Sequence, residues 1–284
     1  MSTYPRTDVQ RILAGSVNPV LRATLLDQDG EPVDAAGAVT CSIERADGTV
    51  LVTGRAATNP TGIGTYECAL TTVEAATLDV LKATWFVGGV QRAVTWHRTV
   101  GGFMYSIAKL RSKLGMQSFT TVELREERDR ITDLIERETG VCWSPAYDVE
   151  RCDGYGRTRH VTRHRPLRAL RSLTLDGISY APSGFDLDLD AGLISGDITF
   201  TGQLVIGIEH GFDTPPATLR DAALIASADR LTRETSAISS RARSVTNDMG
   251  VSMQMSYAGE GHPTGIDEVD SVIVAHDMRS PGFG

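Results

Sequence analysis

The first third of the chain is a series of short runs rich in Val, Thr, Ile and aromatic residues, separated by turn signals. The runs cover residues 20–26, 39–44, 49–53, 64–70, 81–87 and 93–99. Between them, Asp29-Gly30, Asp47-Gly48 and Gly88-Gly89 provide residues that tolerate the positive φ of tight hairpins. Strands at this spacing predict an all-β, immunoglobulin-like (Ig-like) sandwich over residues 17–100, preceded by an N-terminal arm of residues 1–16.

Gly101-Gly102 mark a joint, after which the apolar residues follow a helical period. A short helix is expected over 105–114. A longer one should begin at Thr120, which forms a capping-box pattern with Glu123, and end at Gly140. A third, alanine-rich helix should cover 217–234, and its small side chains allow a neighbouring helix or subunit to approach closely.

Strand-like segments separate the second and third helices. They cover residues 148–152, 158–165, 170–175, 178–180, 185–189, 193–195 and 202–210. We therefore expect an α+β second domain, a helical core with a β insertion, over residues 101–257, with one more strand near 251–257. Residues 258–284 predict an extended C-terminal tail that carries a short helical or strand-like patch at 266–275.

The motifs that carry chemistry are missing. No GxGxxG follows a strand, and GxxxxGK[ST], GxSxG and HExxH do not occur. His160 and His164 lie four apart without a third ligand nearby, and no cysteine pair has zinc spacing. Cys41 and Cys68 could face each other across the sandwich, but reduced thiols are the simpler expectation. The sequence thus predicts no enzyme, no cofactor and no metal site.

The charges of the second domain are segregated along the chain. Residues 151–171 contain seven Arg against Asp153, and residues 172–220 contain seven carboxylates against Arg220. Such polarity favours contacts between copies of one protein, positive against negative. Two alternatives are charges that pair within the subunit and, ranked below both, phosphate contacts to DNA. The residues expected at the inter-subunit interface are Arg157, Arg159, Arg163, Arg165, Asp186, Asp188 and Asp190.

Asp186, Asp188 and Asp190 also raise the question of a calcium site, because a hard cation prefers several converging oxygens. A solvated strand face is the favoured interpretation, with Leu187 and Leu189 as its buried half.

Three segments of residues 105–284, taken in order, resemble the head-to-tail connector (adaptor) proteins of long-tailed bacteriophages, in particular those of actinobacteriophages. They are the helix LREERDRITDLIERETG, the strand-turn-helix VIGIEHGFDTPPATLRDAALIASADRLTRE and the ending HPTGIDEVDSVIVAHDMRSPGFG. The region 17–100 lies outside the minimal connector and is similar to the Ig-like decorations of phage structural proteins.

The resemblance implies a homo-oligomeric ring, typically dodecameric, in the neck of the virion beneath the portal protein. Double-stranded DNA would pass through it, and a downstream stopper or tail-terminator protein would attach to it. The acidic net charge of −8 fits a channel that does not grip DNA. The expected channel-facing residues are Glu123, Glu126 and Glu127. The residues expected to dock into the portal are Ile266, Val269, Val272, Ile273, Met278 and Phe283.

The ring protein would assemble in the host cytoplasm and would not involve a membrane, because no apolar run approaches the ~18 residues of a membrane span. Two rivals remain: a carbohydrate- or capsid-binding decoration module and a hydrolase with an Ig-like accessory domain. Exposed Trp85 and Trp96 would favour the first, although Trp85 is more in keeping with a core position. The second lacks any acid/base or nucleophile constellation.

Overall fold

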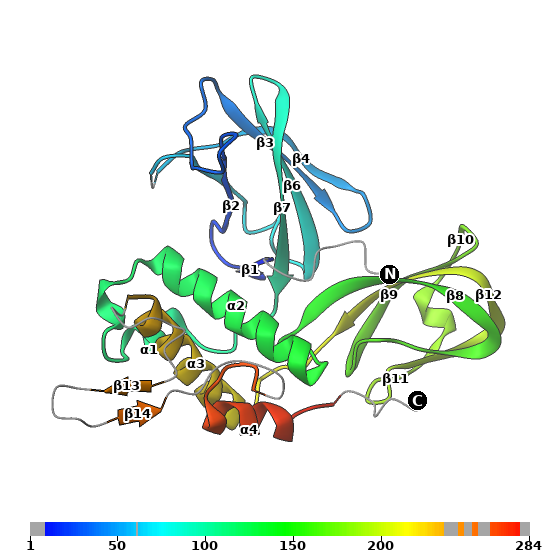
Figure 1. Cartoon of the computed structure of the whole chain (residues 1–284). Helices are drawn as coiled ribbons and strands as arrows, with labels where there is room; N and C mark the ends of the chain where they lie inside the picture. Colours follow the sequence, from blue (N-terminus) through cyan, green and yellow to red (C-terminus); the bar gives the residue numbers. More distant parts are fainter. Residues whose placement is uncertain (1–8, 61, 236–243, 247–251, 255–261, 279–284) are drawn as a thin grey trace. The chain divides into compact units, whose positions relative to one another are not determined.

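The computed structural model describes residues 9–60, 62–235, 244–246, 252–254 and 262–278 of the 284-residue chain. It divides into two compact units, each made of two chain segments (Figure 1). The first unit combines Met1–Gly102 with Ser144–Asp213, and the second combines Phe103–Trp143 with Thr214–Gly284. Within the described residues, no helix is long and apolar enough to cross a membrane.

A five-stranded sheet in the order β1-β7-β6-β3-β4 forms the larger layer of the N-terminal region. Its strands are β1 (Gln10–Leu13), β3 (Val39–Arg45), β4 (Val50–Ala56), β6 (Asp79–Val87) and β7 (Val90–Val100). Strand β1 corrects the expectation of an arm over residues 1–16, because it pairs in parallel with the end of β7 and buries Ile12. Its four residues are too few to show a period in the sequence.

The core of this region lies between that sheet and a two-stranded ladder of β2 (Val20–Thr24) and β5 (Thr65–Ala69). Buried and half-buried residues alternate along β3, as its period-2 pattern predicts. Trp85 is fully buried, and its indole Nε1–H donates to Thr95 Oγ1 at 2.9 Å. The thiols of Cys41 and Cys68 are free and buried in this core.

A second sheet completes the first unit. It contains β8 (Ala146–Val161), β9 (Leu167–Leu175), β10 (Ile178–Tyr180), β11 (Asp186–Asp188) and β12 (Leu193–His210), with a 3-10 turn at Pro182–Gly184. Strands β8 and β12 are long and continuous where the sequence predicted two pieces each. Gly154, which the sequence suggested as part of a turn with Asp153, faces Gly202 within the ladder. A Cβ on Gly154 would lie 2.3 Å from the Phe200 carbonyl oxygen, so this glycine permits close strand approach.

The first unit is continuous from one sheet to the other. The Gly101 N–H donates to the Pro145 carbonyl at 2.8 Å, and Arg171 Nη1 donates to the Leu78 carbonyl at 2.7 Å. The β insertion therefore belongs to the same compact unit as the N-terminal strands. From the sequence it was expected to share a domain with the helices, over residues 101–257.

The second unit is helical. It holds α1 (Ile107–Arg111), a 3-10 turn at Met116–Ser118, α2 (Thr121–Thr139), α3 (Ala217–Thr235) and α4 (Asp267–Ala275), and a short ladder of β13 (Ser244–Thr246) with β14 (Ser252–Gln254). The capping box is confirmed: Thr120 Oγ1 accepts the Glu123 N–H, and Glu123 accepts the Thr120 N–H at 2.7 Å. Gly140 ends α2 with φ 72°. The alanines of α3 serve packing within the unit, because Ala222, Ala223 and Ala226 are buried.

Helix α4 lies within the patch at 266–275 that was expected to be helical or strand-like, but it is part of the helical unit and not of an extended tail. It packs against both α2 and α3, and Val269 and Ile273 are buried. The buried carboxylate of Asp270 accepts the N–H of Thr264 at 2.9 Å and the N–H of Gly265 at 3.2 Å. Apolar residues at helical spacing over 266–273 account for the helix.

Candidate functional site

The interface residues expected from charge lie on two strands that flank β12. Ser195 of β12 pairs with Arg159 of β8 on one side and with Asp186 of β11 on the other. Arg157 lies on β8, and Arg163 in the turn after it, while Asp188 lies on β11 and Asp190 follows it. The arginine block and the aspartate block, separate in the sequence, therefore occupy opposite edges of one three-stranded region.

Several arginines of the basic block pair within the subunit. Arg168 contacts Asp213 at 2.6 Å, and Arg171 contacts Glu209. By contrast, Arg157, Arg159 and Arg163 are exposed and form no ion pair with any described residue. Pairing within the subunit therefore accounts for the inner arginines and leaves the outer ones available.

Arg165 belongs to neither of these groups of arginines. It is half-buried, and its aliphatic carbons lie against Gly192, where a Cβ would come within 2.7 Å of Arg165 Cγ.

The three aspartates follow the solvated-strand interpretation. Asp186 and Asp188 are exposed on β11, while Leu187 between them packs against the sheet core. Asp188 Oδ1 accepts the Ala191 N–H at 3.0 Å, which closes the turn that holds Asp190. Leu189 is 46% exposed, so its expected burial is wrong, because the strand ends at Asp188 and the turn directs it outward.

The expected channel-facing glutamates differ in exposure. Glu123 is exposed in the capping box, and Glu126 is exposed on the next turn. Glu127 is buried at 2%, within 3.1 Å of Arg130 Nη1 and 3.7 Å of Arg230 Nε. The expectation that Glu127 faces outward is therefore corrected. The helical period places it on the same side of α2 as the buried Leu124 and Ile131.

The residues expected to dock into the portal are mostly used within the helical unit. Val269 and Ile273 are buried, so they form part of its core. Ile266 and Val272 are half-buried, and Met278 is 53% exposed. Phe283 lies outside the described residues.

The two tryptophans that a glycan-binding surface would need do not form an exposed pair. Trp85 is fully buried, and Trp96 on β7 is half-buried.

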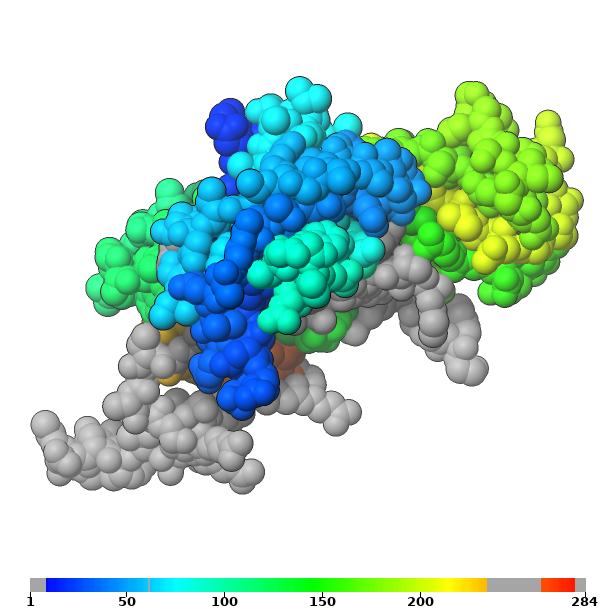
Figure 2. Space-filling view, turned by 90° about the horizontal axis from the view of Figure 1, so that it is seen from above, coloured from blue at the N-terminus to red at the C-terminus, as the bar shows by residue number. Residues whose placement is uncertain are grey.

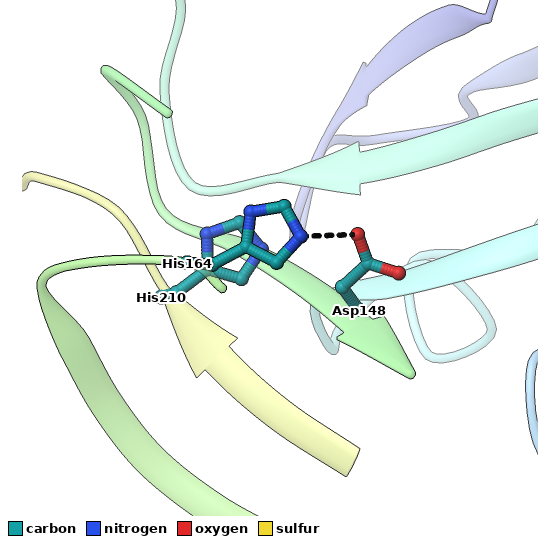
Figure 3. Close-up of side chains that lie close together, drawn as sticks. All are labelled: Asp148, His164 and His210. Carbon is teal, nitrogen blue, oxygen red and sulfur yellow. Dashed lines mark ion pairs between the residues drawn. The ribbon is translucent and has the colours of Figure 1, made fainter. Parts of the chain in front are cut away.

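The structure also brings together three residues that the sequence did not connect (Figure 3). Asp148 lies at the start of β8, His164 follows the end of β8, and His210 ends β12. His164 Nε2 lies 3.2 Å from Asp148 Oδ2, and the two imidazole rings stack with centroids 4.2 Å apart. His210 is distant in sequence from Asp148 and His164. Strand β12 brings the three together, because it pairs with β8 at Asp148 and with β9 at Leu167, three residues after His164.

Asp148 is the electrostatic centre of this cluster. Burial by itself raises the pKa of a carboxyl, but the hydrogen bond with His164 and the nearby charge of Arg98 together hold the pKa of Asp148 below its usual range. Arg98 Nη2 lies 3.6 Å from Asp148 Oδ2. Because Arg98 belongs to β7, the carboxylate links the two sheets of the first unit.

The same residue types could suggest a metal centre, because the three ligand atoms lie within 4.8 Å of one another. A metal ion must lie in the plane of each imidazole that binds it, about 2 Å from the nitrogen. The planes of His164 and His210 are only 19° apart and therefore do not meet near both nitrogens. The positive charge of Arg98 also opposes a cation there, so the arrangement is a buried ion-pair network.

Comparison with known proteins adds no assignment: no family model matches the chain, and no curated protein sequence matches it.

Proposed function

We propose that this protein is a structural head-to-tail connector (adaptor) of a tailed phage virion. It forms a homo-oligomeric ring beneath the portal protein, and the resemblance of its sequence implies a dodecamer. DNA passes through the ring, and the stopper or tail-terminator protein attaches to its far side. The protein performs no chemistry in this role.

This proposal rests mainly on which segments of the chain form the helical unit. Helices α2, α3 and α4 come from the three segments on which the resemblance rests, and they pack against one another. The unit is discontinuous in sequence, because residues 144–213 are inserted between α2 and α3. A helical core with a β insertion is the arrangement that the connector resemblance implies. The packing of α4 against this core departs from the tail that the resemblance implies would reach into the portal.

The N-terminal strands fit the same proposal as an added module. We assign residues 17–100 to an Ig-like decoration, because a core with Trp85 at its centre fills the space between two β layers. The connector function would then reside in the remainder of the chain.

The mass of the purified protein tests the proposal. Sedimentation velocity and native mass spectrometry should detect a large closed ring, either alone or after addition of the portal protein of the same virion. Electron micrographs of that species should show a central hole. A protein that stays monomeric at every accessible concentration and does not co-sediment with the portal would contradict the proposal.

A further inference from the structure

We propose that neighbouring copies of this chain meet through two opposite edges of the second sheet. The basic edge comprises Tyr155, Arg157, Arg159 and Arg163, and the acidic edge comprises Asp186, Asp188 and Asp190. The basic edge of one copy contacts the acidic edge of the next. This inference rests on the proposed ring, and it adds which surface joins the subunits.

Strand pairing places the two edges on either side of β12. Residues Leu193–Ser195 of β12 pair with β8 on one side and with β11 on the other. Within the described residues, β8 and β11 each pair with β12 and with no other strand. Near their ends, the Leu167 N–H of β9 donates to the Leu189 carbonyl just after β11, and the Arg163 N–H donates to the Glu150 carboxylate. Edge strands present unpaired backbone N–H and C=O groups, which makes them natural sites of contact with another chain. Figure 1 shows β8, β11 and β12 in the same part of the molecule, and Figure 2 shows the green to yellow segment of this sheet at the molecular surface.

The two edges carry opposite charges. All residues from 155 to 159 of β8 are exposed, and Arg157, Arg159 and Arg163 form no ion pair with any described residue. On the other edge, Asp186 and Asp190 are exposed and likewise form no ion pair within the described part of the chain. Both edges therefore retain exposed charge that is available to a partner of the opposite sign.

The opposite charges also determine the symmetry of the contact between copies. Opposite charges on opposite edges make a head-to-tail contact, because each copy presents both halves of the interface. A two-fold contact of either edge with itself would bring like charges together. A head-to-tail contact that closes on itself generates a ring.

The character of the basic edge also suits a protein partner. Tyr155 is 83% exposed and Val161 is 61% exposed, so apolar area accompanies the arginines. Tyr and Arg are both enriched at protein interfaces.

DNA is the rival occupant, and the acidic edge argues against it. A phosphate backbone that crossed the sheet from the arginines would meet the carboxylates two strand spacings away, roughly 10 Å. Their like charge opposes the phosphates there, and salt screens part of this repulsion because the Debye length is about 8 Å at physiological ionic strength.

A charge-swap experiment tests the inference on the full-length protein. One variant carries Arg157→Glu and Arg159→Glu, and the other carries Asp186→Arg and Asp188→Arg. Each variant alone should lose the oligomer and sediment as a single chain, because both of its edges then carry the same sign. An equimolar mixture should recover the wild-type oligomer, because each edge again finds an opposite one. Raising the salt concentration should dissociate the wild-type oligomer.

Matched reversals provide the control. Arg92→Glu and Asp29→Arg change exposed charges elsewhere on the first unit and should leave the mass unchanged. Circular dichroism spectra of all variants should match the wild type.

Four outcomes would overturn the inference. If the wild type assembles and both swaps leave the mass unchanged, copies meet elsewhere and the proposed ring survives. If the swaps dissociate it and the mixture does not reassemble, the edges are not each other's partners. If the wild type does not self-associate at any concentration, both this contact and assembly of the ring by itself are wrong. Loss of DNA retardation in the arginine variant, with its mass unchanged, would identify the edge as a nucleic-acid surface instead.

Discussion

At the scale of single residues, the polar groups buried in the first unit are the most sensitive points of the structure. His97 on β7 is completely buried, and its Nε2 lies 2.8 Å from Thr95 Oγ1, the same hydroxyl that accepts from Trp85. Asp148 is buried between His164 and Arg98. Both residues depend on charge states that solvent conditions and mutations can change.

His97 predicts an acid-sensitive fold. Burial lowers the pKa of His97 from 6.5 to about 3. Between these values the unfolded chain binds a proton that the folded chain excludes, so this residue's effect is absent above about pH 6.5. Below it, stability should fall by up to about 1.4 kcal/mol per pH unit. Urea unfolding followed by tryptophan fluorescence at pH 7.5, 5.5 and 4.5 measures this.

The variant His97→Gln should show a weaker decline of stability with falling pH than the wild type. Arg92→Gln, at an exposed position elsewhere in the first unit, should retain the wild-type decline. An unchanged pH dependence in His97→Gln would show that other groups cause the acid sensitivity.

Replacement of Asp148 should show how much the buried ion-pair network contributes to the free energy of unfolding. Asp148→Asn keeps the size of the side chain but leaves Arg98 and His164 without their carboxylate. The free energy of unfolding should fall by about 3 kcal/mol, which is typical of removing one partner of a buried ion pair. Chemical denaturation at pH 7 measures it. Asp29→Asn on the surface should change stability by less than about 0.5 kcal/mol, and an equally small effect of Asp148→Asn would contradict the network's structural role.

At the scale of secondary-structure elements, local rules worked where local interactions decide. Thr120, Glu123 and Gly140 predicted both ends of α2, because capping depends on residues within one turn. The same rules failed for β8 and β12, which were each expected as two pieces: Asp153-Gly154 indicates a turn by itself, but Gly154 lies paired with Gly202 inside the ladder. They also missed β1, which depends on a partner far away in sequence.

Helix α4 carries a prediction at this scale. Asp270 accepts hydrogen bonds from the Thr264 N–H, the Thr264 hydroxyl at 2.6 Å and the Gly265 N–H, and it fixes the segment that leads into α4. In Asp270→Ala, we expect the free energy needed to open α4 to fall by about 2 kcal/mol, which is the size of the contribution of hydrogen bonds to a charged group. Hydrogen exchange of residues 267–275 should accelerate about thirtyfold, while exchange in β6 stays unchanged. Glu268→Ala, on the exposed side of α4, should have little effect. Equal exchange rates in both variants would contradict this anchor role.

At the scale of the whole molecule, the chain separates into a β-rich unit and a helical unit whose segments alternate in sequence. This alternation has a consequence for experiments on fragments. A cut near residue 101 would leave residues 144–213 without the strands that they contact through Arg171, Gly101 and Arg98. The full chain is therefore the proper object for tests of assembly, and the mass measurement and the charge swap both use it.

The sequence by itself determined the β-rich first third, the ends of α2, the position of α3 and the segregation of charge along residues 151–220. These features depend on local propensity, capping and composition, which act over a few residues. Only the tertiary structure decided that Glu127 and Val269 are buried, that Asp148 meets His164 and His210, and that arginines and aspartates flank the same strand. Each of these depends on strand register or helix packing between residues far apart in sequence, and the local pattern does not contain that information.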